Sequence, residues 1–291
     1  MKNITKIDSK ILSSCHINFL FGAGVNGLAF PQLDSFVKTV SLLRQFSQNY
    51  EGFENTINKL NDKQRKKVWS SFKKEYEEFD ERVDENNASI KNIKELFASI
   101  NKLIDLSENR TKTTKQVCIY TINYDEIVEK SINNLGYLIN TVSYSNYVNH
   151  DRFFNLVGYN YRYQKFIPTY LVLKLHGDIS NPILPGQAKY DEAMASKRFE
   201  LFFTMKEKLT RFNSALFVIG YSGRDEHINE ILQDCVASGL TVYWFKFKKD
   251  DIVPSNLAEL VYIIDNPNIG QDTTKTCADM INELWKKQLE E

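Results

Sequence analysis

Residues 16–27, HINFLFGAGVNG, decide how this chain folds. The apolar run from Ile17 to Phe21 ends abruptly in glycine, and a run of this length is typical of a fully buried strand. The glycines that follow form the pattern G-x-G-x-x-G over residues 22–27. Such a turn lets the backbone approach a pyrophosphate, which the N–H groups at the start of a following helix would face. An ordinary glycine turn has the same pattern, so its meaning depends on how the later strands end.

The composition is that of a globular protein with a sizeable core. Of the 291 residues, 42% are hydrophobic, and 37 Lys plus Arg balance 37 Asp plus Glu. A chain without net charge has no overall field to attract nucleic acid or an anionic membrane, so we expect neither partner. The N-terminus has no apolar signal core, and no apolar run is long enough to span a bilayer. We therefore expect a cytoplasmic protein.

The four cysteines are far apart in the sequence, and none forms a C-x-x-C pair. A zinc ribbon is therefore not expected, and we predict no metal. Buried free thiols are the ordinary state of such cysteines in a reducing cytosol. They are Cys15, Cys118, Cys235 and Cys277.

Further apolar runs predict the other strands of a sheet. Segments with helical periodicity lie between them, and strands with continuous apolar runs that alternate with helices predict a parallel sheet covered on both faces. The expected class is α/β, a Rossmann-like doubly wound parallel sheet, whose ligands bind at the carboxyl ends of the strands. These runs are 117–120, 170–175, 215–219, 240–247 and 261–264.

The helical segments are predicted from apolar residues that recur every three or four positions. A short helix over residues 3–14 would lead into the first strand, and residues 188–210 would form a later helix. Residues 137–170 are rich in aromatic side chains and predict a small subdomain or a pair of short strands. Pro31 would begin the helix behind the glycine turn. The apolar face of that helix would carry Leu33, Phe36, Val37, Val40 and Leu43.

Residues 50–110 differ in character from the rest of the chain. Apolar side chains such as Phe72 and Phe97 recur there at helical spacing among many Lys and Glu residues. We predict a helical insertion of two or three helices within a single domain that covers residues 1–291. Its charged residues are typical of a solvated helix surface with paired charges, and a docking surface or a lid is the alternative.

Four predicted strands end in unusual clusters, namely Gly-Ala-Gly at 22–24, Thr-Ile-Asn-Tyr-Asp at 121–125, Leu-His-Gly at 175–177 and Gly-Tyr-Ser-Gly-Arg-Asp at 220–225. Each cluster has an ordinary explanation on its own. Asn123 could cap a turn, and a lone His176 is more often a core histidine than a functional group. Because the carboxyl ends of parallel strands meet at one edge of a sheet, the four clusters together predict one shared site.

The motifs GAGVN, TINYD, KLHGD and GYSGRDE resemble those of the sirtuin family, and most of all those of bacterial sirtuin-like effectors of antiphage defence. They lie within residues 19–232. The resemblance implies a single sirtuin-like domain that uses NAD⁺ as its substrate. It implies an NAD⁺ glycohydrolase that depletes NAD⁺ in abortive infection. Because such an enzyme has to be kept inactive until needed, we also expect a homo-oligomer or a separate sensor chain as its regulator.

The resemblance also implies roles for individual residues. Asn123 would contact the nicotinamide ribose and help place a water, and His176 would be the general base. Histidine can take a proton near neutral pH, and the asparagine amide can orient a water because it both donates and accepts. The cofactor-binding residues would be Gly22, Ala23 and Gly24 at the pyrophosphate, Asn26 in the place of the usual serine, Thr121, Asp125 at the nicotinamide carboxamide, Gly220 and Ser222 on the adenosine side, and Asp225 shaping that loop.

Two departures from the family decide between activities. Deacylating sirtuins carry a module with four zinc-binding cysteines, and the segment with arginine that usually follows their glycine turn is not visible after Pro31. Both departures favour NAD⁺ hydrolysis over protein deacylation, which is the alternative. A non-catalytic nucleotide sensor is a third interpretation. A dehydrogenase is favoured only by the glycine motif. It would need an Asp or Glu at the end of a second strand, about 20 residues after the glycines, and this sequence predicts a helix there.

Overall fold

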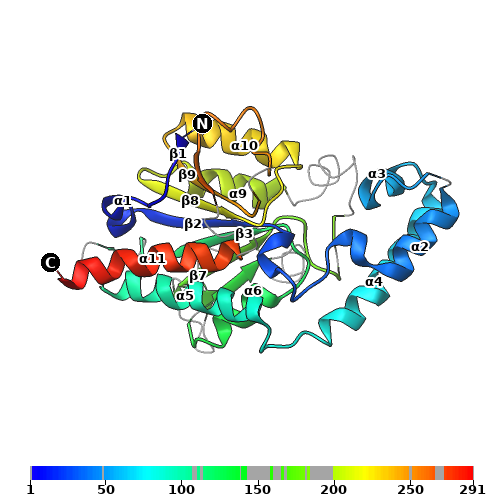
Figure 1. The fold of residues 1–291 in the computed structure, drawn as a ribbon, viewed down its shortest axis with the longest axis horizontal. Coiled ribbons are helices and arrows are strands. Elements are labelled where there is room, and N and C mark those ends of the chain that lie inside the picture. The colour runs from blue at the N-terminus through cyan, green and yellow to red at the C-terminus, as the bar shows by residue number, and fades with distance from the viewer. Residues whose placement is uncertain are drawn as a thin grey trace.

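The fold is built around one eight-stranded sheet, in the order β1-β10-β9-β8-β2-β3-β7-β4 (Figure 1). All seven strand pairs in it are parallel. The strands are β1 (Lys2–Asn3), β2 (His16–Phe21), β3 (Val117–Thr121), β4 (Ile139–Val142), β7 (Tyr170–Lys174), β8 (Ser214–Ile219), β9 (Thr241–Lys246) and β10 (Tyr262–Asp265). The structure, a computed structural model, describes residues 2–47, 49–106, 110–111, 114–137, 139–142, 158–159, 165–166, 169–180, 182–183, 199–248, 251–265 and 272–290.

The predicted central strand is β2, and the chain winds outward from it in both directions. Phe19 of β2 lies opposite Ile119 of β3 on one side and Phe217 of β8 on the other. From β3 the sheet continues to β7 and β4, and from β8 it continues to β9, β10 and β1. The predicted doubly wound parallel sheet is therefore confirmed.

Helices cover both faces of the sheet, because alternate side chains of each strand point in opposite directions. Phe19 and Phe21 pack against Phe97 of α5 (Ala88–Leu106), with ring centroids 6.5 and 6.3 Å apart. The intervening Leu20 belongs to the opposite core. Figure 1 shows α5 and α11 (Thr273–Glu290) on one face, and α9 (Phe199–Leu209) and α10 (Glu226–Ala237) on the other.

A helical extension projects beside the sheet and consists of α2 (Val37–Phe46), α3 (Phe53–Asn58) and α4 (Asp62–Asp80) (Figure 1). Phe36 packs on Phe72 of α4 with ring centroids 4.7 Å apart. The Glu75 side chain of α4 accepts hydrogen bonds from Lys38 N at 3.1 Å and Thr39 N at 3.0 Å. Glu75 thus satisfies N–H groups in the first turn of α2 that have no partner within that helix. Aromatic packing and this capping bond hold the extension together.

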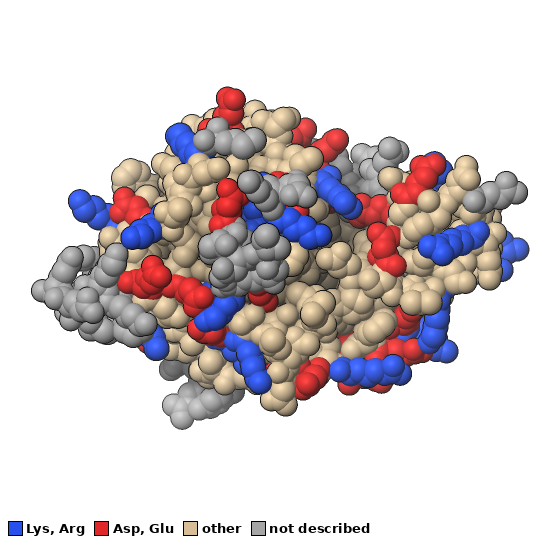
Figure 2. All heavy atoms as spheres, in the orientation of Figure 1, with Lys and Arg blue, Asp and Glu red and all other residues tan. Residues whose placement is uncertain are grey.

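Helix α4 of the extension begins with a recognisable local signal. Asn61 accepts from Gln64 N at 3.0 Å, and the Gln64 side chain accepts from Asn61 N at 3.2 Å, which is a capping box at the start of α4. On the face drawn in Figure 2, basic and acidic side chains are interspersed over the extension. Lys38 and Glu78 form one such ion pair at 2.6 Å.

Residues 50–110 were expected to form one helical insertion, but their helices lie in two different places. Helices α3 and α4 lie in the extension with α2, whereas α5 packs on the sheet and against α11. Helix α5 is therefore the crossover that a parallel connection from β2 to β3 requires. Apolar residues recur at helical spacing in both α4 and α5. This periodicity predicted the two helices, but it did not indicate which part of the protein each helix packs against.

Three other expectations need correction. Residues 3–14 do not form one helix, because β1 pairs with β10 and only Ser9–Ser14 are helical, as α1. The helix after Pro31 begins at Val37, and the Val37 side chain is 74% exposed and so does not belong to the buried face of α2. Of the helix expected at 188–210, only α9 falls within the described residues.

The region expected as a small subdomain or a strand pair is described only in part. Strand β4 extends the main sheet beside β7, and β5 (Gly158–Tyr159) pairs antiparallel with β6 (Lys165–Phe166). The remaining residues between 143 and 168 lie outside the described residues, so the choice between the two interpretations stays open.

Candidate active site

The four predicted clusters follow β8, β2, β3 and β7, which are consecutive neighbours in the sheet. All four strands run in the same direction, so their carboxyl ends form one edge. Gly22 follows β2, Asn123 follows β3, His176 follows β7 and Gly220 follows β8. The structure therefore brings the predicted residues to one side of the molecule.

The glycine turn is packed directly against the end of β8. Gly22 N donates to Ile219 O at 3.1 Å, and Gly24 N donates to Gly220 O at 3.0 Å. A Cβ placed on Gly22, Gly24 or Gly220 would lie less than 3.0 Å from backbone atoms of the opposite segment. Gly220 also has a φ of +67°, in the left-handed region that favours glycine. Close packing of two backbone segments is thus enough to require these three glycines.

The turn does not lead into the long helix that the glycine pattern predicted. It is followed by η1, a 3₁₀ helix of four residues, Ala23–Asn26. Ala23 is exposed and Gly24 is half-buried, so this segment is the part of the turn that a ligand can reach. Any pyrophosphate contact would come from the backbone of this short turn and not from a full helix N-terminus.

Asn123 ties the end of β3 to the glycine turn. Its Nδ2 donates to the carbonyl of Gly22 at 3.2 Å, and its backbone N–H donates to Thr121 Oγ1 at 3.1 Å. The side chain is buried. These bonds fix the amide plane and leave Asn123 Oδ1 as the acceptor on the other side of the group.

Asp125 is held by the protein on both carboxylate oxygens. Oδ2 accepts from Asn26 Nδ2 at 2.6 Å, and Oδ1 accepts from Ile127 N at 3.1 Å at the start of α6 (Ile127–Asn133). Burial raises the pKa of Asp125, and the nearby Lys174 ammonium opposes this shift. Asn26 therefore has a partner in the protein, and both residues position the loop after β3.

Lys174 and Glu129 form a buried ion pair that sequence reasoning missed. Lys174 Nζ lies 3.0 Å from Glu129 Oε1, with side-chain exposures of 2% and 9%, and it also donates to the carbonyl of Asp125. Lys174 thereby joins the end of β7 to the loop after β3 and to α6. The available signal was a lysine inside the apolar run Tyr-Leu-Val-Leu-Lys-Leu, because a charge in a buried strand needs a partner.

A cavity of about 490 Å³ opens beside Asp125. Its volume lies in the range of about 300–1,000 Å³ that is usual for small-molecule sites. Helices α4 and α6 and the segment after β7 provide its walls, so the helical extension contributes to it. Its lining includes Tyr76, Asp80, Tyr124, Asp125, Glu126, Glu129, Lys174 and Asp178.

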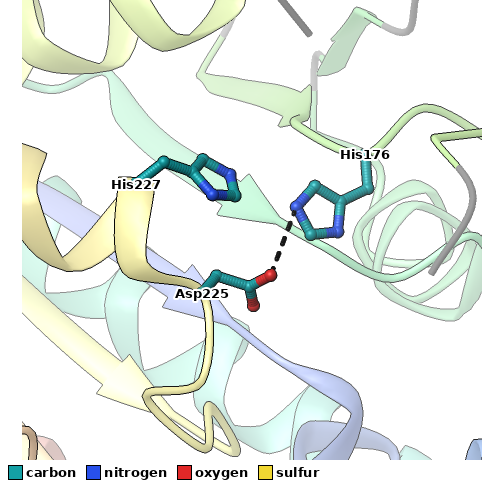
Figure 3. A group of neighbouring side chains, drawn as sticks. All are labelled: His176, Asp225 and His227. Atoms are coloured by element: carbon teal, nitrogen blue, oxygen red, sulfur yellow. Dashed lines mark ion pairs between the residues drawn. The ribbon is translucent and has the colours of Figure 1, made fainter. Parts of the chain in front are cut away.

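His176 faces two side chains from the start of α10 (Figure 3). His176 Nε2 lies 3.9 Å from Asp225 Oδ1, and the rings of His176 and His227 have centroids 5.8 Å apart. All three residues are buried. Asp225 stands at the N-cap position but makes no side-chain capping bond. Its carboxylate faces His176, and its role in shaping the adenosine loop stays a prediction.

His227 follows the motif GYSGRDE directly and was not among the predicted site residues. Phe202 of α9 packs edge-on against its ring, with centroids 5.1 Å apart. The signal that could have identified it is the spacing Asp-x-His at a helix start, which places both side chains in one turn.

The loop after β8 is rigidly built, and Ser222 is its exposed residue. Tyr221 Oη donates at 3.1 Å to the carbonyl of Asp225 and lies 3.0 Å from Asn229 Oδ1. Asn229 Nδ2 donates to Gly223 O at 2.7 Å. Ser222 thus lies on the outer part of the loop, and Asp225 on its inner part beside His176.

The four cysteines were expected to be buried free thiols. All four are buried and free. Within the described part of the chain, His176, Asp225 and His227 form the one group of three or more residues whose ligand atoms converge. Among the described helices, none combines the length and the apolar character needed to cross a membrane.

The fold of this chain is similar to that of known proteins. Residues 117–260 match the family model of the SIR2-like domain, whereas no curated protein matches the chain significantly. The structure of a Sir2 homologue in complex with NAD is similar over 99% of this chain and 97% of that chain, with 12% sequence identity and a TM-score of 0.50.

Two other similar structures come from work on the mechanism and regulation of Sir2 enzymes and on sirtuin substrate affinity. The first shares 13% identity over 97% of each chain, with a TM-score of 0.48. The second shares 13% identity over 94% of this chain and 96% of that chain, also with a TM-score of 0.48. Residues 117–260 therefore match a SIR2-like domain, and the chain as a whole has the fold of the Sir2 homologue.

Proposed function

We propose that this protein is an NAD⁺ glycohydrolase that cleaves the bond between nicotinamide and ribose. The observation that carries the proposal is the position of His176, whose Nε2 lies 3.9 Å from the buried carboxylate of Asp225. The similar Sir2 homologue was solved with NAD, and its fold is shared by this chain. A general base and a nucleotide fold at one sheet edge are the minimum that this reaction needs.

The reaction makes modest demands on the protein. Nicotinamide leaves with the bonding electron pair, and the ribose carbon becomes an electron-poor, oxocarbenium-like centre. Water then bonds to that carbon while His176 accepts one of its protons. The Asp225 carboxylate would hold the imidazole in place and stabilise the imidazolium that forms, as carboxylates do beside catalytic histidines.

Asn123 would orient the water. Its Nδ2 is engaged by the Gly22 carbonyl, so its Oδ1 is the atom that would accept a hydrogen bond from a water or a ribose hydroxyl. Because the same bond anchors Asn123 to the glycine turn, the group that binds the pyrophosphate and the group that places the nucleophile would move as one unit.

The remaining residues would bind the two ends of NAD⁺. Backbone N–H groups near Ala23 and Gly24 would contact the pyrophosphate, with Gly220 and Ser222 on the adenosine side. Asp125 would recognise the carboxamide from its place on the wall of the 490 Å³ cavity. Its ties to Asn26 and Ile127 support a rigid recognition group.

The four-cysteine zinc module of deacylating sirtuins has no counterpart among the buried free cysteines, which argues against protein deacylation. A pure sensor would need neither a base nor a water-placing amide. By resemblance to defence effectors, we propose that NAD⁺ depletion in an infected cell is the biological role. The extension α2–α4 would then be the surface for self-assembly or for a regulatory chain.

The test is the purified full chain incubated with NAD⁺, with nicotinamide release followed by chromatography. His176→Ala and Asn123→Ala should fold, as judged by circular dichroism, and His176→Ala should lose about 10²- to 10⁴-fold in rate. His16→Ala is the matched control, because His16 begins β2 at the opposite edge of the sheet. A His176→Ala protein at the parental rate would refute the mechanism, and release that depends on an acylated peptide would indicate a deacylase.

A further inference from the structure

We propose that His176, Asp225 and His227 also bind a divalent transition-metal ion, with Zn²⁺ as the best fit. Occupancy of this site would inhibit the enzyme, and this second part rests on the proposed function. The three side chains come from two elements, the end of β7 and the first turn of α10, and they point toward one another (Figure 3).

The distances are close to those of a metal site. The three ligand atoms all lie within 4.8 Å of one another, and His176 Nε2 is 3.9 Å from Asp225 Oδ1. Tetrahedral zinc ligands at about 2.0–2.1 Å from the ion lie about 3.3 Å from each other. The side chains therefore have to approach by about 1.5 Å or less, which small side-chain rotations provide.

The donor types select the ion. Two imidazoles and one carboxylate suit Zn²⁺ and its neighbours in the first transition row, whereas Mg²⁺ and Ca²⁺ prefer sites made of oxygen. Three protein ligands leave a fourth position for water. Such an open site binds an exchangeable ion, in contrast to a closed structural zinc site.

The surroundings hold the ligands in place. His227 packs edge-on against Phe202, and the backbone carbonyl of Asp225 accepts a bond from Tyr221 Oη at 3.1 Å. His176, Asp225 and His227 are 3%, 8% and 9% exposed. A buried and pre-formed ligand set loses little side-chain freedom on binding, and outer contacts of this kind usually strengthen metal affinity.

Metal binding and catalysis would compete for the His176 imidazole. Zn²⁺ at His176 Nε2 would take the place of the Asp225 contact there and leave the ring proton on Nδ1, so that neither nitrogen could accept a proton from water. Asp225 would be engaged in the same way. The metal would therefore act as a reversible inhibitor of NAD⁺ cleavage.

The first experiment measures binding without any activity. The full chain is stripped with a chelator and titrated with Zn²⁺ by equilibrium dialysis, and with Co²⁺ while visible absorption is recorded. We expect one Zn²⁺ per chain, a Co²⁺ band typical of nitrogen and oxygen ligands, and no displacement by Mg²⁺. His227→Ala should weaken Zn²⁺ binding at least tenfold, whereas His16→Ala should bind as the parent does.

The second experiment asks whether Zn²⁺ inhibits nicotinamide release by the parent, and whether His227→Ala requires at least ten times more Zn²⁺ for the same inhibition. Unchanged Zn²⁺ affinity in His227→Ala would overturn the site. If that variant does not fold, zinc-edge anomalous diffraction from the parent decides, and density away from the three residues would overturn the proposal. Zn²⁺ bound at these residues in a protein without NAD⁺ cleavage would refute only the proposed function.

Discussion

Removal of Lys174 from its buried pair with Glu129 should destabilise the fold strongly. In Lys174→Met the Glu129 carboxylate stays in a site where its side chain is only 9% exposed, and the Asp125 carbonyl loses a donor. Loss of one partner of a buried ion pair typically costs about 3–5 kcal/mol, because the other charge remains buried without compensation. We expect a loss of that size in the free energy of unfolding.

The cost should depend on pH in a defined direction. Burial raises the pKa of Glu129 above its ordinary value of 4.5, while Lys174 lowers it. Without Lys174 the folded protein holds the Glu129 proton to a higher pH than the unfolded chain does. Stability of Lys174→Met should therefore fall as pH rises above about 4.5, and the defect should be larger at about pH 8 than at about pH 5.

Urea denaturation of the parent, Lys174→Met, Glu129→Leu and the double variant provides the measurement. The double variant should be more stable than Lys174→Met, because two apolar side chains replace a lone charge. Lys206→Met is the control, since its pair with Asp234 is exposed and should leave the urea midpoint unchanged. A Lys174→Met protein within about 1 kcal/mol of the parent at pH 8, or strictly additive single effects, would refute the reasoning.

Three further variants test the packing at Gly24 and Phe97 and the burial of Asp125. Gly24→Ala should cost about 1–3 kcal/mol in urea denaturation, because its Cβ would lie 2.7 Å from Gly220 Cα; a parental midpoint would mean that the two segments separate easily. Phe97→Ala should cost about 3–5 kcal/mol by the same assay, since its ring fills the space against Phe19 and Phe21; a loss below about 1 kcal/mol would contradict this packing. Burial raises the pKa of Asp125 above 3.8, so stability of the parent should fall with rising pH just above that value, and Asp125→Asn should lack this component when unfolding is measured between about pH 4 and 6.

The sheet could be predicted because its strands are continuous apolar runs, which need no knowledge of partners. The helices were harder to place for a physical reason. A stripe such as that around Phe97 indicates that one face is buried, but it carries no information on whether the sheet or another helix covers it. The short strand β1 was missed because two residues at a sheet edge produce no pattern.

The site was predictable to the extent that it depends on strand ends. Glycines 22 and 24 were expected to serve a ligand. Their contact with Gly220, almost two hundred residues away in the chain, means that the packing of the fold needs them as well. His227 and Lys174 were missed because their roles depend on neighbours from other elements, which periodicity does not reveal.

The position of β2 in the middle of the sheet also affects how the chain reaches its native state. Asn18 of β2 bonds to Ala215, 197 residues further along, and to Tyr120, 102 residues away. Large loops must close before this strand has both neighbours, so formation of the sheet centre should be slow. During synthesis β2 lacks one of its two neighbouring strands until β8 has left the ribosome. A chain truncated before β8 should therefore aggregate and not fold as a smaller domain.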